Sequence, residues 1–162
     1  MSNSARRIAA AKEALASGQY MLRRSDAGRS NGGKFQWAAI GEWTEAPDWN
    51  TRRTCGGGLH GNHPTRGWAY WTSMVDLDFC EIDPEHVVEL NDKLKVRRAR
   101  VLLRNDLSAL NGLSIVGNLY LGGCTGLTAL PDGLSVGGNL DLGGCTKQLK
   151  YDADQRGLRR YD

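Results

Sequence analysis

Four residues between positions 55 and 80 are of the types that bind zinc. Cys55, His60 and His63 lie on one glycine-rich segment, and Cys80 follows on a separate apolar segment. Thiolate and imidazole groups are the usual ligands of tetrahedral Zn²⁺. Structural zinc sites are usually built from two close ligand pairs, however, and Cys80 stands alone. The sequence therefore favours structural roles for these side chains, with no bound cofactor, and zinc is the alternative.

A run of basic residues is the candidate for binding phosphate groups; it consists of Lys93, Lys95, Arg97, Arg98 and Arg100. In one extended strand the first three would share one face and the last two the other, because side chains alternate. Acidic residues that could neutralise this run lie nearby, at Asp76, Asp78, Asp83, Glu85 and Asp92. The net charge of +3 is also mild. A salt-bridged surface is therefore predicted, and nucleic-acid binding is not.

The first 104 residues carry the patterns of both helix and strand. Ile8, Ala11 and Leu15 form one apolar stripe, which predicts a helix over residues 5–17 with Ser4 as its cap and Gly18 as its stop. Strands are expected over residues 20–23, 34–37, 77–82 and 93–103, and a helical run over 65–71. Helices and strands joined by short turns indicate an α+β domain over residues 1–104.

The last third of the chain repeats itself. Glycine accounts for 21 of the 162 residues, against about 7% on average, and many of these glycines flank the repeats. Equivalent residues lie 21 positions apart: Leu113 and Leu134, Asn118 and Asn139, Leu119 and Leu140, Leu121 and Leu142, and Cys124 and Cys145. A fixed period with leucines in register is typical of a solenoid. We therefore expect a short two-coil leucine-rich-repeat-like β-solenoid over residues 105–149, and a capping tail over 150–162 that is too polar to form a core element.

The alternation of residues within each coil predicts which side chains face outward. In Leu119-Tyr120-Leu121 the leucines point inward and Tyr120 points outward, and in the second coil Asp141 takes the place of Tyr120. Asn118 and Asn139 are expected to form an internal polar ladder, and Cys124 and Cys145 to be small buried residues. Tyr120 and Asp141 are thus the candidate binding residues of the repeats.

The repeat unit resembles leucine-rich-repeat-like arrays of bacterial and phage proteins, in which Leu-Thr-x-Leu-Pro-x-Gly-Leu units recur many times. The resemblance covers residues 106–149, where this chain has two copies. Two coils expose more end surface than they bury between them, so they are not expected to be stable alone. The repeats must therefore pack on the N-terminal part or on another chain.

The N-terminal part has two resemblances of its own. Cys55-Gly-Gly-Gly-Leu-His60, with the closing Lys-Val-Arg-Arg strand, resembles a family of uncharacterised phage and bacterial proteins. More remotely, Gly58-Leu59-His60 followed by Ala69-Tyr70 resembles ADP-ribosyltransferase-like folds. That resemblance implies an NAD site with Arg23, His60, Tyr70 and Glu81 as its catalytic residues, with Glu89 and Trp37 as alternatives for the carboxylate and the aromatic wall. The alternative to this catalytic interpretation is that the aromatic residues simply form a small core.

The composition also indicates where in the cell the chain is expected to work. No apolar run approaches the ~18 residues that a membrane span requires, and the N-terminus lacks the apolar stretch of a secretory signal. A cytoplasmic location is therefore expected, in the host cytoplasm or the virion if the gene is of phage origin. The predicted function is non-enzymatic: a structural, protein-binding or assembly component that contacts a protein partner or itself. The alternative is an ADP-ribosyltransferase-like enzyme using NAD.

Overall fold

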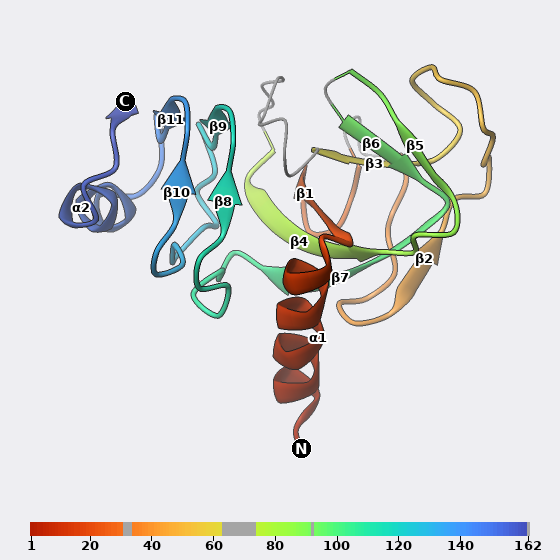
Figure 1. Ribbon diagram of the computed structural model, residues 1–162, viewed down its shortest axis with the longest axis horizontal. Helices are drawn as coiled ribbons and strands as arrows, with labels where there is room; N and C mark the ends of the chain where they lie inside the picture. Colours follow the sequence, from red (N-terminus) through yellow and green to blue (C-terminus); the bar gives the residue numbers. More distant parts are fainter. Residues whose placement is uncertain (31–33, 63–73, 92, 162) are drawn as a thin grey trace.

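The computed structural model describes residues 1–30, 34–62, 74–91 and 93–161, and within them the chain has an α+β fold (Figure 1). A seven-stranded antiparallel sheet is followed by two small parallel sheets, and one helix lies near each end of the chain. The elements are α1 (Asn3–Ser17), β1 (Tyr20–Ser25), β2 (Trp43–Glu45), β3 (Leu59–Asn62), β4 (Asp76–Ile82), β5 (Val87–Glu89), β6 (Lys93–Val96), β7 (Arg98–Arg104), β8 (Ser114–Ile115), β9 (Leu119–Tyr120), β10 (Ser135–Val136), β11 (Leu140–Asp141), α2 (Lys147–Gln155) and β12 (Arg160–Tyr161). Neither helix in these ranges has the length and apolar character needed to cross a bilayer.

Helix α1 begins two residues earlier than its apolar stripe predicts. The hydroxyl of Ser2, not that of Ser4, accepts a hydrogen bond from the Ala5 N–H at 3.1 Å and caps the helix. Ser4 is wrong as the cap because it already lies inside the first turn. The helix ends at Gly18 as predicted, and the φ of +74° there is one that glycine adopts readily. Ala11 and Ala14 bury the face that packs on the sheet.

The large sheet has the strand order β2-β7-β4-β1-β3-β6-β5. Only Arg97 separates β6 from β7 in sequence, yet three strands lie between them in the sheet. The sheet must therefore bend over on itself, as Figure 1 shows by placing β3, β5 and β6 opposite β4 and β7. The single strand expected over residues 93–103 is wrong. It breaks at Arg97, whose N–H donates to the His86 carbonyl and whose carbonyl accepts from Ala46.

A second expected strand, over residues 34–37, is also wrong. Its backbone forms only an isolated bridge between Gln36 and Arg29. Trp37 is nevertheless buried, in a core cluster enclosed by the bent sheet that includes Met21, Leu59 and Val101. The aromatic residue was a signal of burial rather than of strand. The helical run expected over residues 65–71 lies outside the described residues.

The two repeats pair in the register that their period predicts. Ser135 of β10 lies opposite Ser114 of β8, and Leu140 of β11 lies opposite Leu119 of β9, each pair parallel and 21 positions apart. Leucines of both repeats are buried in a core cluster that also contains Ala11 of α1 and Phe79 of β4. The apolar interior is thus continuous from the helix and sheet into the repeats.

The C-terminal tail contributes to this same interior, which corrects the expectation that it is too polar for a core element. Thr146 caps α2 by accepting a hydrogen bond from the Leu149 N–H. Leu149 and Ala153 are fully buried against the second repeat, and β12 pairs with β11. The helix was missed because only two apolar side chains, four residues apart, mark its buried face.

Polar groups tie the sheet to the repeats. Arg24 is 4% exposed, and its guanidinium donates to the carbonyls of Met74, Gly122 (3.0 Å) and Tyr120 (3.4 Å). The chain turns from β7 into the first repeat at Asn105, which has a φ of +64° and whose carbonyl accepts hydrogen bonds from both the N–H and the hydroxyl of Thr128. The junction is therefore held by hydrogen bonds as well as by the shared core.

Replacing Arg24 tests this junction. We expect Arg24→Met to lower the free energy of unfolding by about 3 kcal/mol, because it leaves buried carbonyls on both sides without a donor. Urea denaturation would measure the loss, with Arg6→Met on the exposed part of α1 as the control. If the two variants were equally stable, Arg24 would not be holding the repeats to the sheet.

Candidate functional site

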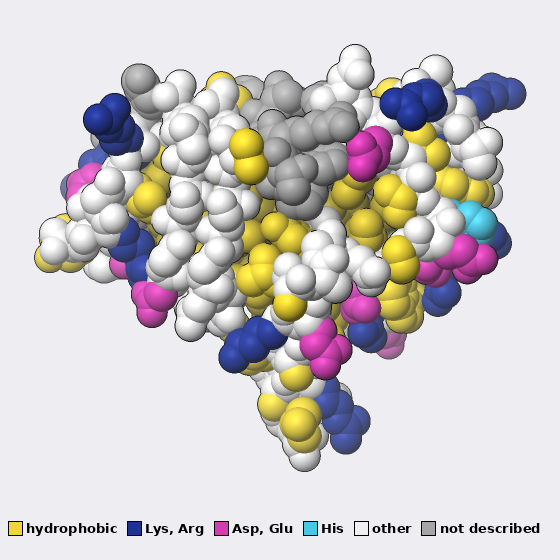
Figure 2. Space-filling view, viewed as in Figure 1, with side chains coloured by type: hydrophobic (Ala, Val, Ile, Leu, Met, Phe, Trp, Pro, Cys, Tyr) yellow, Lys and Arg dark blue, Asp and Glu magenta, His cyan; other side chains and the backbone are white. Residues whose placement is uncertain are grey.

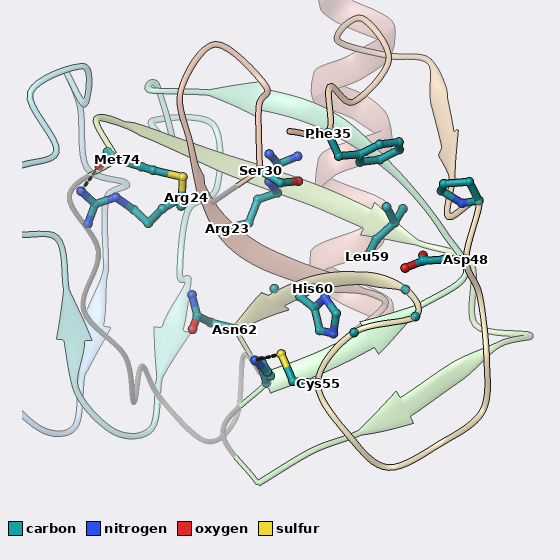
Figure 3. A pocket seen from close by; sticks show the side chains of 16 residues that line it. Arg23, Arg24, Ser30, Phe35, Asp48, Cys55, Leu59, His60, Asn62 and Met74 are labelled. Carbon is teal, nitrogen blue, oxygen red and sulfur yellow. Dashed lines mark hydrogen bonds between the residues drawn. The ribbon is translucent and has the colours of Figure 1, made fainter. Parts of the chain in front are cut away.

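A cavity of about 500 Å³ opens beside β3, between the bent sheet and the loop that precedes this strand (Figure 3). Its wall combines charged, polar and apolar groups: Arg23, Arg24, Ser30, Phe35, Pro47, Asp48, Cys55, Gly56, Gly57, Gly58, Leu59, His60, Gly61, Asn62, Met74 and Lys93. Its volume is that of a small-molecule site. Two of the residues expected to be catalytic, Arg23 and His60, share this wall.

His60 is held in the cavity wall by its place on β3, where its backbone pairs with that of Lys95. The Nε2 atom is buried and has no hydrogen-bond partner. Burial lowers the pKa of His60 to about 4, and the positive charges of Lys93 and Lys95 act in the same direction, while Asp48 opposes them. At neutral pH the imidazole is therefore uncharged and keeps its capacity to take up a proton.

The two cysteines among the candidate zinc ligands lie in separate parts of the structure. Cys55 is exposed on the cavity rim, where the Lys93 ammonium donates to its sulfur at 3.2 Å. Cys80 is buried in the core cluster of the bent sheet and is not part of the cavity wall, and burial raises the pKa of its thiol. His63 lies outside the described residues. Among the residues described, no three His, Cys, Asp or Glu side chains gather as a metal site would need.

Arg23 is engaged in the sheet rather than presented to a substrate. Its guanidinium stacks over the Trp37 ring at 3.8 Å, donates to the Gly28 carbonyl at 3.1 Å and pairs with the buried carboxylate of Asp78. Asp78 also accepts two hydrogen bonds from Arg104. This ion-pair network supports the cavity wall from behind.

Glu81, the carboxylate expected to be catalytic, does not line the cavity. Glu81 accepts a hydrogen bond from Arg100 Nε at 2.6 Å and is absent from the cavity wall, as is Glu89 on β5. The aromatic ring beside this pair is that of Trp43, with the guanidinium groups of both Arg98 and Arg100 at 4.9 Å from its centre. Tyr70 lies outside the described residues. The structure thus brings Arg23 and His60 together but does not bring Glu81 to them.

A residue that sequence reasoning missed is Lys95, which was assigned to a solvated basic face. It is fully buried, and its ammonium donates to the Asn50 side chain and to the carbonyls of Arg52, Thr54 and Gly56. All four acceptors come from one loop, about 40 residues earlier in the chain. The run of basic residues gave no sign of this, because the acceptors are neutral backbone and amide oxygens.

Tyr120 and Asp141 are register neighbours on the parallel sheet of the repeats, half-buried and side by side. The Tyr120 hydroxyl accepts a hydrogen bond from Asn118, and the Asp141 carboxylate accepts one from the Gly143 N–H. The Asn118 carbonyl oxygen in turn accepts from the Asn139 backbone, so the expected ladder is a side-chain-to-backbone contact. The polar groups of both candidate binding residues are therefore used within the chain.

A second hollow lies at the end of the repeats, between β10 and the C-terminal tail. It measures about 750 Å³ and is lined by Val136, Gly137, Gly138, Asn139, Gly157, Leu158, Arg159 and Arg160. Sequence reasoning did not locate it. The signal was the number of repeats, because the chain continues into α2 after the second repeat and β10 has no third repeat to pair with in the described residues.

Fold and geometry define an α+β protein with a cavity beside β3, lined by both charged and apolar groups, and a hollow at the end of its repeats. No protein-family model, curated protein or solved structure matches the chain.

The pKa of His60 predicts how stability depends on pH. The unfolded chain takes up a proton at His60 near pH 6.5, whereas the folded chain does so only near pH 4. Because the unfolded state binds more protons in this interval, wild-type stability should fall as the pH drops from 6.5 to 4, and His60→Gln should fall less steeply. Urea denaturation across this range measures the slopes, and imidazole resonances of His60 that titrated near pH 6.5 would contradict the account.

Proposed function

We propose that this protein is a protein-binding module whose two repeats form a short two-coil solenoid, and that β10 pairs with an extended segment of a partner protein. The observation that carries the proposal is the unpaired backbone of Val136 beside the hollow at the end of the repeats. The chain needs no cofactor for this role.

The solenoid interpretation is supported by how the coils stack. Equivalent residues of the two repeats pair in parallel at two separate places, β8 with β10 and β9 with β11. Glycines lie where the coils approach most closely: a Cβ on Gly137 would lie 2.2 Å from the Val116 carbonyl oxygen. Stacked coils of this kind bury a shared core. In the last repeat β12 covers the outer edge of β11, whereas β10 pairs with no described strand other than β8 and keeps an open edge.

The open edge of β10 follows from its hydrogen bonds. The N–H groups of Ser135 and Gly137 donate to the carbonyls of Leu113 and Ile115 in the first repeat. Because successive backbone groups of a strand point in opposite directions, the N–H and C=O of Val136 point away from that repeat. No described residue forms a hydrogen bond with either group. They are free to pair with an added strand.

The surface around this edge is almost uncharged. From Gly112 to Cys145 the only Asp, Glu, Lys or Arg residues are Asp132 and Asp141, and Figure 2 shows few charged side chains over β8 and β10. Val116 is 64% exposed in this part of the chain, and the hydroxyl residues Ser114 and Ser135, which are register partners, are also exposed. Charged residues are depleted at the centres of protein interfaces. This supports a protein partner over a charged ligand.

We assign the occupant as an extended segment of a different protein, with small or apolar side chains and an acidic residue toward Arg159. Arg159 is exposed and lines the hollow, so it can pair with a carboxylate at the end of the added strand. We place recognition here rather than at Tyr120 and Asp141, because the polar groups of those two residues already have partners within the chain.

A lysine on the open edge should block binding, since charged side chains on edge strands oppose the addition of a further strand. The probe is a displayed library of random peptides of about ten residues, enough for one strand. We expect selected peptides to bind wild type and Val116→Lys equally, and Val136→Lys at least about tenfold more weakly. Val116 is the control because it is an exposed valine of the first repeat, next to Ile115, which is the register partner of Val136 and whose strand edge β10 already covers.

Two results would contradict the proposal. One is the absence of any enriched peptide, or peptides that bind Val136→Lys as well as wild type. The other is a mass in light scattering that doubles with concentration and returns to that of a monomer in Val136→Lys, which would make a second copy of this chain the occupant. Thermal melts of both lysine variants establish that they are folded.

A further inference from the structure

We infer that the cavity beside β3 binds the phosphate group of a small molecule, with the loop over residues 52–58 and Lys93 as its cradle. This site is independent of the repeats and of the strand-binding edge. It rests on the direction of backbone N–H groups, on the charges of the cavity wall and on His60.

The loop over residues 52–58 surrounds the buried ammonium of Lys95. The Lys95 ammonium holds the carbonyls of Arg52, Thr54 and Gly56, every second residue, turned toward itself. Lys95 is fully buried and is not part of the cavity wall, whereas Cys55, Gly56 and Gly57 are. The loop therefore lies between the ammonium and the cavity.

Peptide planarity then fixes where the N–H groups point. In a trans peptide the carbonyl of one residue and the N–H of the next point in opposite directions. The N–H groups of Arg53, Cys55 and Gly57 consequently point away from Lys95. Since Cys55 and Gly57 line the cavity, we infer that their N–H groups face it. None of the three donates to any residue in the described ranges. Converging backbone N–H groups of this kind form anion-binding concavities.

Glycine is required for this course of the loop. Gly56 and Gly57 have φ values of +92° and +68°, a region that other residues rarely adopt. A Cβ on Gly58 would lie 2.5 Å from Cγ of Lys95, so the loop could not close over the lysine stem with a larger residue. The Cys-Gly-Gly-Gly segment is thus explained by the loop geometry that directs the amides.

The charges of the cavity wall also favour an anion. Three cationic residues line the wall, Arg23, Arg24 and Lys93, against the single carboxylate of Asp48 among the described lining residues. The guanidinium groups of Arg23 and Arg24 already have partners within the chain, so they contribute charge to the wall and not a direct contact. Asp78 offsets Arg23 from behind the wall. Lys93 is the cation on the loop side, because its ammonium lies 3.2 Å from the Cys55 sulfur. An anion beside Cys55 would therefore meet Lys93 and the loop amides together.

The protonation of His60 should respond to an anion bound in the cavity. Its Nε2 atom is buried without a partner, and the groups that act on it are Lys93 and Lys95 of β6 and Asp48 of the preceding loop. An anion in the cavity would offset the two ammonium charges and favour the protonated imidazole. Anion binding should then be accompanied by proton uptake at His60.

The remaining wall indicates what carries the phosphate. Phe35, Leu59 and Met74 are apolar, and Asp48, Asn62 and Ser30 carry oxygen atoms that can accept from a hydroxyl or amino group of the ligand. Figure 3 shows Asp48 and Cys55 at separate places on the wall, with the labelled His60 side chain near Cys55. A small organic phosphate ester with a polar group opposite its phosphate fits this pattern.

The experiment titrates the whole chain with inorganic phosphate and, separately, with glycerol 3-phosphate, while the amide resonances are followed by NMR. Lys93→Gln removes the cation at the cavity, and Lys147→Gln, on the exposed start of α2, removes the same charge elsewhere. We expect shifts of the Cys55 and Gly57 amides in wild type and Lys147→Gln, and binding at least about tenfold weaker in Lys93→Gln. Tighter binding of the ester identifies an organic phosphate as the ligand, and equal binding identifies free phosphate.

A sulfate titration separates the role of His60, because sulfate keeps its charge over the pH range used. Sulfate should bind more tightly at pH 5 than at pH 7 in wild type, and equally at both in His60→Gln. The inference is overturned if no anion shifts the loop amides, or if Lys93→Gln and Lys147→Gln weaken binding equally, which would mean a nonspecific charge effect.

Discussion

The central strand β1 is buried on both faces, and the rest of the structure is arranged around this constraint. Tyr20 and Leu22 point into the core shared by α1, β4 and the repeats, whereas Met21 points into the core of the bent sheet. The strand then continues with two arginines, each 4% exposed. Burying a guanidinium is costly unless acceptors and counter-charges lie around it. Each arginine therefore requires a set of partners, and those partners define the two halves of the molecule.

On one face, the Arg24 guanidinium donates to the carbonyls of Met74 and of the first repeat, and so fixes the repeats against the sheet. Two repeats alone would bury too little, but here their leucines continue a core that begins at α1 and ends at α2. The repeats are consequently packed against the sheet at one end and against α2 at the other. On the other face, Arg23 and Asp78 support the wall of the cavity beside β3.

The parts of the fold that were predictable from sequence are those specified by local pattern. The period of 21 residues places Leu119 opposite Leu140, and Gly18 ends α1, because both depend on residues close in sequence or on exact repetition. Burial of Lys95 was not predictable, since its acceptors belong to a loop 40 residues away. The break at Arg97 has the same cause: it depends on the backbones of His86 and Ala46. Of the candidate site, His60 and Arg23 were found by residue type, but the Glu81–Arg100 pair reflects sheet register that the sequence does not display.

Amide hydrogen exchange followed by NMR tests at once whether the sheet and the repeats unfold as one cooperative unit and whether β10 has an open edge. Ser135 and Gly137, whose N–H groups are bonded to the first repeat, should exchange as slowly as the amides of β4, while Val136 between them exchanges quickly. A protected Val136 amide would mean that the edge is already covered. Ser135 and Gly137 amides that exchange long before those of β4 would mean that the repeats unfold independently of the sheet, which contradicts the central role of β1.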